Sequence, residues 1–194
     1  AVLAPEVRNQ GAVIAQMGTV ALASGEAIDL HFDSNNRLTS LRVAPSQIQA
    51  LVDNRHAVQA PGGLVILSAQ SLDRLAGGVV SNSGAIEANS LTAKGGRIVL
   101  EADRIELQSG SRLDASGATG GGTVLVGGDW QGSGDMHQAT TVTMEAGASI
   151  DASATQQGDG GKVVLWSDIH NANSLTTAQG SVLARGGAQG GNGG

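Results

Sequence analysis

Short stretches in which apolar residues alternate with other residues recur along the chain, and four of them begin at a pair of glycines. In each of the four, the second and fourth residues after the second glycine are aliphatic. Such alternation is typical of a short strand with one buried face. The eight residues are Val65, Leu67, Ile98, Leu100, Val124, Val126, Val163 and Leu165. Four similar strands cannot each build a core, so we expect them to stack in register and share one ladder of aliphatic side chains.

A second alternating element interleaves with the first and supports the same interpretation. Its clearest copies are 84–88, 110–115 and 147–152, and similar sequences occur at 9–15 and 180–184. A third, weaker strand is expected between the two elements, as at 105–107 and 142–144. Three short strands per coil, with glycine-rich corners, predict an all-β fold, a parallel β-helix that spans residues 1–194 as a single unit.

The composition argues against other fold classes. Glycine accounts for 30 of the 194 residues, roughly double its usual share, and it is unfavourable inside helices. A β-sandwich would use hairpins with two-residue turns, and a βαβ fold would need amphipathic helices between the strands. Most gaps between the strands are too short and too rich in glycine for either alternative.

Two segments interrupt the repeat. Residues 31–61 are predicted to leave the coil, with a strand at 37–43 and then a short helix that starts at Pro45 and places Ile48, Leu51 and Val52 on one face. A further short helix is expected near 69–75. Residues 127–140 are predicted to form one long loop.

Charge and composition exclude several functions. The net charge is −6 and only 14% of the residues are charged, which argues against a nucleic-acid-binding surface. No apolar run approaches the roughly 20 residues of a membrane-spanning helix. The chain has no cysteine and therefore no disulfide framework. Its first residues lack the features of a signal peptide and its last nine read as an unfinished turn, so we expect an internal piece of a longer protein.

Three stretches resemble the filamentous haemagglutinin family of large exoproteins. They are 79–88, with the sequence VVSNSGAIEA, 121–132, with GGTVLVGGDWQG, and 158–168, with GDGGKVVLWSD. The segment that leads to Ala60-Pro61-Gly62-Gly63 is also similar to the part that follows the secretion domain in such proteins, whose Asn-rich signature is not present here.

The resemblance implies several properties of the whole protein. The fold would be a right-handed β-helix, and the precursor would be secreted through an outer-membrane two-partner secretion transporter. The location would be extracellular or at the cell surface, with a role in attachment to cells or to a biofilm matrix, through host or matrix glycans or proteins.

Three acidic residues, Glu87, Asp114 and Asp151, occupy the same place in successive copies of the second element. Alternation points them outward in one column. We expect a solvated acidic stripe; a weak calcium site between the carboxylates is the alternative.

The outward positions of the double-glycine strands are also apolar, which is unusual for a solvent-facing column. We expect an insert to cover them, either the helix near Leu51 or the loop at Trp130. The alternative is a lateral surface that binds a neighbouring fibre or a receptor. The column consists of Ile66, Val99, Leu125 and Val164.

Two tryptophans are candidates for ligand binding. Trp130 lies between Asp129 and Gln131, and Trp166 is followed closely by Asp168. An indole ring beside polar side chains could serve as a platform for a sugar, or it could only shield the edge of a coil.

Nothing in the sequence indicates catalysis. The four histidines lack the spacing of metal ligands, and no Ser/His/Asp arrangement is present. Lys94, Arg97 and Lys162 are too sparse for the charged site of a polysaccharide lyase or hydrolase. We therefore expect no enzyme activity, metal or cofactor. The predicted function is a structural and adhesive stalk; a filament subunit that associates end to end or laterally is the alternative, and a polysaccharide-active enzyme is a remote one.

Overall fold

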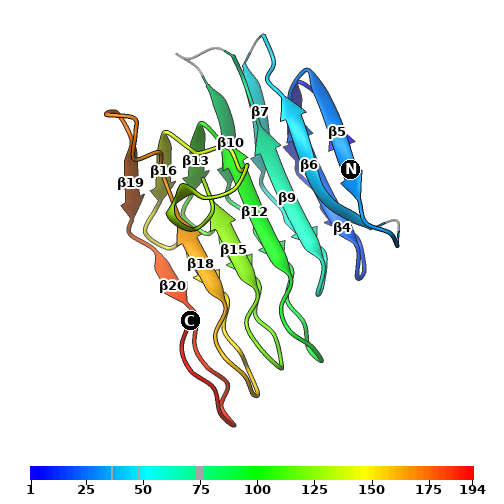
Figure 1. Cartoon of the computed structure of the whole chain (residues 1–194), viewed down its shortest axis with the longest axis vertical. Helices are drawn as coiled ribbons and strands as arrows, with labels where there is room; N and C mark the ends of the chain where they lie inside the picture. The colour runs from blue at the N-terminus through cyan, green and yellow to red at the C-terminus, as the bar shows by residue number, and fades with distance from the viewer. Residues whose placement is uncertain (36, 48, 73–76) are drawn as a thin grey trace.

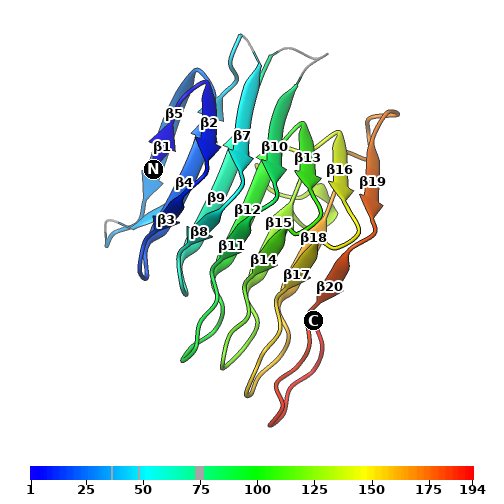
Figure 2. The same cartoon turned by 180° about the vertical axis from the view of Figure 1, so that it is seen from behind.

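The chain winds as a stack of three-stranded coils. The computed structural model describes residues 1–194 except 36, 48 and 73–76. Strands of the same kind pair between coils and form three six-stranded parallel sheets. Figures 1 and 2 show the strands of successive coils side by side, with the N-terminal coils at one end of the stack and the C-terminal coils at the other. The predicted parallel β-helix is confirmed.

Each sheet contains one kind of strand. Sheet A holds the double-glycine strands and consists of β1 (Val2–Leu3), β4 (Thr19–Ser24), β9 (Leu64–Ala69), β12 (Arg97–Ala102), β15 (Thr123–Val126) and β18 (Lys162–Leu165). Sheet B consists of β2 (Glu6–Asn9), β7 (Ala50–Asn54), β10 (Gly78–Asn82), β13 (Arg104–Leu107), β16 (Thr141–Met144) and β19 (Leu175–Ala178). Sheet C consists of β3 (Ala12–Ile14), β8 (Ala57–Gln59), β11 (Ala85–Glu87), β14 (Arg112–Asp114), β17 (Ser149–Asp151) and β20 (Ser181–Leu183).

The aliphatic ladder of sheet A lies in register inside the coil. Val65 pairs with Ile98, Ile98 with Val124, and Val124 with Val163. Leu67, Leu100, Val126 and Leu165 pair in the same way. Val163 and Leu165 are partly exposed and the other six are fully buried. Because each buried aliphatic side chain contributes about 1.5–3 kcal/mol, this ladder is a main source of stability.

The double glycines are required for close approach of successive corners. A Cβ atom on Gly96 would lie 2.1 Å from the carbonyl oxygen of Gly63, and one on Gly122 would lie 2.2 Å from that of Gly96. Of the eight glycines in these pairs, only Gly62 has a positive φ, of 65°. The absence of a side chain, more than a left-handed backbone, therefore selects glycine at these corners.

A short polar ladder runs along the stack at the corner between sheets B and C. The side-chain amide of Asn9 donates to Asn54 Oδ1 at 2.7 Å, that of Asn54 to Asn82 Oδ1 at 2.7 Å, and that of Asn82 to Ser111 Oγ at 2.5 Å. Asn54 and Asn82 are fully buried. Each side-chain amide forms a hydrogen bond with the next one, and these bonds offset the free-energy cost of burying polar groups.

The first interruption is a β-hairpin. β5 (Ala27–Phe32) pairs antiparallel with β6 (Leu38–Ala44). Leu41 and Val43 of the hairpin pack against Ala21, Ala23 and Ile66 on the outer face of sheet A. The hairpin, shown in blue in Figure 1, therefore covers the N-terminal part of that face.

The short helix predicted after Pro45 is wrong for the residues that the structure describes, and Ile48, which was assigned to its face, lies outside them. Residues 50–54 form β7, whose Val52 is fully buried and pairs with Val7 on one side and Val80 on the other. A short apolar run fits a helix face or a strand equally well, and here strands on both sides take up its backbone hydrogen bonds. The excursion from the coil is therefore the hairpin 27–44 rather than 31–61, because 50–54 and 57–59 belong to sheets B and C.

The helix expected near 69–75 falls in part on 73–76, outside the described residues. Of the rest, Ala69 ends β9, and Ser71 forms a parallel bridge with Ser46.

The second interruption, between β15 and β16, is a loop with one turn of 3₁₀ helix, η1 (Trp130–Gly132). Asp129 caps this turn by accepting the N–H of Trp130 at 2.6 Å. The loop passes over the outer face of sheet A near β15 and β18 (Figure 1). Leu125 and Val164, on that face, are buried.

Candidate functional site

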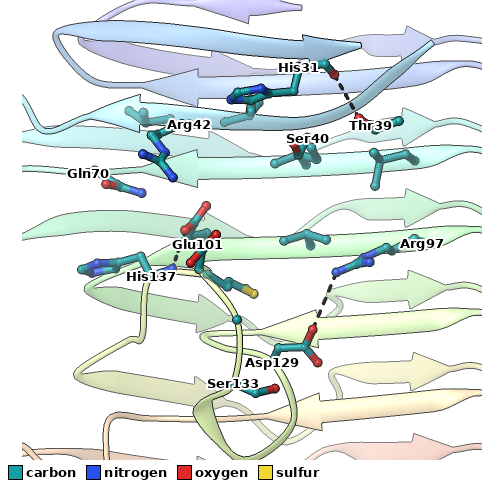
Figure 3. Close-up of a pocket in the computed structure, with 18 residues that line it drawn as sticks. His31, Thr39, Ser40, Arg42, Gln70, Arg97, Glu101, Asp129, Ser133 and His137 are labelled. Carbon is teal, nitrogen blue, oxygen red and sulfur yellow. Dashed lines mark hydrogen bonds and ion pairs between the residues drawn. The ribbon is translucent and has the colours of Figure 1, made fainter. Parts of the chain in front are cut away.

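A groove of about 780 Å³ lies on the outer face of sheet A. Its two walls are the hairpin and the loop 127–140, and its floor is formed mainly by β9 and β12. Figure 3 shows the polar side chains that enter it. Binding sites for small molecules are commonly concave, with an apolar surface and a few placed polar groups. This groove is concave as well, and its lining is as polar as it is apolar.

The floor follows one strand. The outward residues of β12 are Arg97, Val99 and Glu101, at alternate positions. Two residues along a parallel strand span about 6.6 Å, so a guanidinium, an aliphatic group and a carboxylate follow one another over about 13 Å of backbone. The groove therefore has a charged group at each end of its floor and an apolar middle.

Glu101 is the most deeply placed charge in the groove. It is 9% exposed and accepts the backbone N–H of His137 at 2.6 Å and the hydroxyl of Ser68 at 3.4 Å. Burial raises the pKa of this carboxyl, and the hydrogen bonds only partly offset that effect. The carboxylate holds the loop against the floor.

The hairpin wall supplies polar groups without partners. The side chains of Arg42 and His31, and of Gln70 beyond the end of β9, make no hydrogen bond or ion pair with any other described residue. Arg42 and Glu101 point toward one another across the groove in Figure 3. The hairpin therefore presents donors and acceptors that are open to a ligand.

The loop wall begins with a small ion-pair cluster. Asp129 accepts from Lys162 Nζ at 2.6 Å and lies 3.9 Å from the guanidinium of Arg97. The hydrogen bond from Lys162 is the main cause that lowers the pKa of Asp129, and burial opposes it. Lys162 is an outward residue of β18, so this cluster anchors the start of the loop to sheet A.

The end of the loop is anchored by a second ion pair. His137 Nε2 lies 2.9 Å from Asp103 Oδ1, and this hydrogen bond is the main cause that raises the pKa of the imidazole. Burial alone would raise the pKa of Asp103, but hydrogen bonds from His137 and from the N–H of Gly78 outweigh it and lower that pKa. His137 therefore joins the loop both to Asp103 and, through its backbone, to Glu101.

The two tryptophans lie in different surroundings. Trp130 is 59% exposed at the tip of the loop and borders a second hollow of about 740 Å³. Trp166 is partly buried, and its Nε1 donates to Gln138 Oε1 at 2.8 Å. Trp166 thus braces the loop.

The polar residues beside the tryptophans have separate roles. Gln131 is exposed and has a φ of 54° within the 3₁₀ turn. Asp168 accepts the N–H of His170 at 2.9 Å. Of the five surface candidates, only Asp129 lines the groove, and the sugar-platform role of the others stays a prediction.

The acidic column is in register but consists of separately satisfied carboxylates. Glu87 pairs with Asp114, and Asp114 with Asp151. Glu87 accepts from Gln59 at 2.8 Å. Asp151 accepts the N–H of Ser153 at 2.8 Å. Two of the three thus have donors of their own without a cation.

Asp114 departs from the expected solvated stripe. It is 4% exposed and accepts hydrogen bonds from Arg112, Ser116 and Asn89. Burial alone would raise the pKa of this carboxyl, but those hydrogen bonds lower it. Among the residues that the structure describes, no group of three or more His, Asp or Glu side chains could hold a metal ion.

Arg42, Glu101 and Gln70 were not identified from the sequence. Only Glu101 left a signal, as a charged residue that follows the apolar run Ile98-Val99-Leu100. Arg42 reaches the groove because the hairpin folds back over the sheet, and no periodicity along the chain indicates that contact. In the described part of the chain, no helix is both long and apolar enough to cross a membrane.

Comparison with known proteins identifies a fold relative. No protein-family model and no curated protein matches the chain. The crystal structure of the HMW1 secretion domain from Haemophilus influenzae is similar, with a TM-score of 0.64 and 24% sequence identity. The match covers 98% of this chain and 52% of that one, so the chain spans about half the length of that domain. At this identity the likeness shows the fold.

Proposed function

We propose that this chain is a β-helical part of a secreted exoprotein of the filamentous haemagglutinin type, exported through an outer-membrane two-partner transporter. Its role is structural and adhesive: a rigid stack of coils at the cell surface or in the extracellular matrix. The observation that supports this most directly is the match of 98% of the chain to a β-helical secretion domain. The resemblance of 79–88, 121–132 and 158–168 to exoprotein sequences supports it independently.

The position of the chain within the precursor is part of the proposal. The sequence resemblance favours a position after the secretion domain, whereas the structural match is to a secretion domain itself. We therefore place it in the N-terminal β-helix of the precursor, within or directly after the secretion domain.

The architecture suits export of an extended chain. Each coil pairs only with its two neighbours, so folding can spread from coil to coil as the chain emerges. The chain has no cysteine, so no disulfide has to form after export. The proposed role requires no catalysis.

The test uses the full precursor, produced in cells with and without its outer-membrane transporter. We expect antibody against this chain to label intact cells or the medium only when the transporter is present. Equal labelling without the transporter would contradict the proposal.

Beads coated with the purified chain should adhere to matrix or host cells, and adherence equal to that of beads coated with albumin would contradict the adhesive part of the proposal.

A further inference from the structure

We propose that the groove between the hairpin and the loop binds a neutral oligosaccharide. This deepens the proposed adhesive function by naming a ligand class and a site. The site is distinct from the tryptophan platforms suggested by the sequence, because of all their residues only Asp129 contributes to it.

The first argument is the pairing of opposite charges that do not satisfy each other. At one end Arg42 faces the carboxylate of Glu101, and the two form neither a hydrogen bond nor an ion pair. A small anion would be attracted by Arg42 and repelled by Glu101. A small cation would be attracted by Glu101 and repelled by Arg42. A hydroxyl group accepts from a guanidinium and donates to a carboxylate, so it suits both.

The second argument is that the other end also offers a donor and an acceptor, here within the ion-pair cluster in which Lys162 donates to Asp129. Arg97 and Asp129 lie 3.9 Å apart, too far for a hydrogen bond, and the hydroxyl of Ser133 lies beside them. A ligand that spans the floor would therefore meet a donor and an acceptor at both ends. A chain of sugar rings with several hydroxyls fits this arrangement better than a compact ligand.

The third argument is the apolar surface between the two ends. The partly exposed Val99 forms the middle of the floor beside the buried Ile66, and the partly exposed Met136 lies on the loop side. Such a surface matches the C–H face of a pyranose ring. The volume of about 780 Å³ is within the usual range of small-molecule sites.

The experiment measures binding of the purified chain to maltohexaose, cellohexaose and mannohexaose by isothermal titration calorimetry, with polygalacturonate as an anionic comparison. We expect at least one neutral hexasaccharide to bind and polygalacturonate to bind more weakly. Arg42→Ala and His31→Ala should each weaken binding of that hexasaccharide by about tenfold, because each removes a hydrogen bond that involves a polar or charged donor.

Matched controls lie away from the groove. Arg104→Ala removes an exposed arginine of sheet B, and His56→Ala removes an exposed histidine between sheets B and C. Both should bind like the wild type. Ser40→Ala, at an exposed groove position, is a third groove variant with little structural risk. Thermal unfolding of all five variants shows whether a loss of binding reflects a loss of fold.

The outcomes separate this proposal from the proposed function. Binding to none of the three hexasaccharides, tighter binding to polygalacturonate, or equal losses in Arg42→Ala and Arg104→Ala would overturn the groove as a neutral-sugar site. Transporter-dependent export of the precursor is measured separately and does not depend on the groove. If the precursor is exported but the chain binds no sugar, only the groove inference is refuted. If the chain binds sugar but the precursor is not exported, only the secretion proposal is refuted.

Discussion

At the residue scale, the tightest constraint in the molecule lies at the glycine corners of sheet A. Backbone oxygens of one coil occupy the space where a side chain of the next coil would begin. This contact explains why the glycine pairs recur in register with the aliphatic ladder. It also means that the corners are far less tolerant of substitution than their position at the ends of the strands suggests.

Gly122→Ala is expected to destabilise the fold by about 2–3 kcal/mol, because its Cβ would lie 2.2 Å from the oxygen of Gly96 and successive corners would have to move apart. Gly11→Ala is the matched control, since a Cβ there meets nothing within 4 Å. Urea unfolding followed by circular dichroism measures both. A cost for Gly122→Ala within 0.5 kcal/mol of the control, about the usual effect of a surface change, would contradict the close-approach explanation.

Asn54→Ala tests the polar ladder. The change leaves a donor of Asn9 and an acceptor of Asn82 without their partner inside the core, which is expected to cost about 2–3 kcal/mol. Asn173→Ala, at an exposed position, is the control. Equal unfolding midpoints in urea for the two variants would show that the ladder contributes nothing to stability.

At the element scale, the two excursions convert one face of the coil into a groove. The apolar outward column of sheet A is covered at one end by the hairpin, where Ile66 packs, and Leu125 and Val164 are buried near the loop. Val99 lies between the two coverings and remains partly exposed. The sequence predicted that an insert covers this column, but the insert at the hairpin end is a pair of strands and not a helix.

The anchoring of the loop is expected to weaken as the pH rises. The folded-state pKa of His137 is raised above its ordinary value of about 6.5, so its pairing with Asp103 is fully present below that pH and is lost as the pH passes the raised value. Asp103, whose folded-state pKa is lowered, loses its contribution only when the pH falls below its ordinary value of about 3.9. The anchor is therefore strongest between about pH 4 and 6.5.

Hydrogen exchange of residues 127–140 at several pH values, corrected for intrinsic exchange rates, measures this effect. Protection of the loop should fall from pH 6 to pH 9 in the wild type and should be low at both values in His137→Gln. Glu101 acts in the same direction but from a lower pH, because its folded-state pKa is raised and its ionisation disfavours the folded state once the pH rises above its ordinary value of about 4.3. Protection that rises with pH in the wild type would refute the assigned roles.

Removal of the hairpin is expected to leave the coil folded but to cause association. Replacing 27–44 with a short Gly-Ser linker is feasible because Glu26 donates its N–H to Ala44 at 2.9 Å, so the two ends are close. The change exposes Ala21, Ala23 and Ile66, which now pack under the hairpin. Light scattering after size exclusion should show dimers or larger species with an unchanged strand signal, whereas a monomer would show that the hairpin does not protect this face.

At the scale of the whole molecule, the parts predicted from the sequence are those set by the repeat. Val65, Ile98, Val124 and Val163 could be aligned because successive coils place the same residue type at the same position. The hairpin on sheet A, the contact of Arg42 with the groove and the anchoring of His137 depend on single excursions with no second copy for comparison. The asparagine ladder had a signal, since Asn9, Asn54 and Asn82 each precede a coil corner. Asparagine is mostly exposed in proteins, however, so the residue type alone does not predict that these side chains are buried.

The stack of coils also predicts how stability is distributed. Each coil contacts only its neighbours, so a central coil such as that of β10, β11 and β12 is held on two sides, whereas β19 and β20 are held on one. In a one-dimensional array of this kind the ends open first and the opening spreads inward. Amide hydrogen exchange measured by mass spectrometry should therefore show protection that falls from β12 toward β2 and β20.

Ile98→Ala, which removes a fully buried side chain of the ladder, should lower protection most in β9, β12 and β15 and leave β20 nearly unchanged. A uniform loss across all coils would instead mean that the chain unfolds in one cooperative step, and coil-by-coil folding during export would then lose its physical basis.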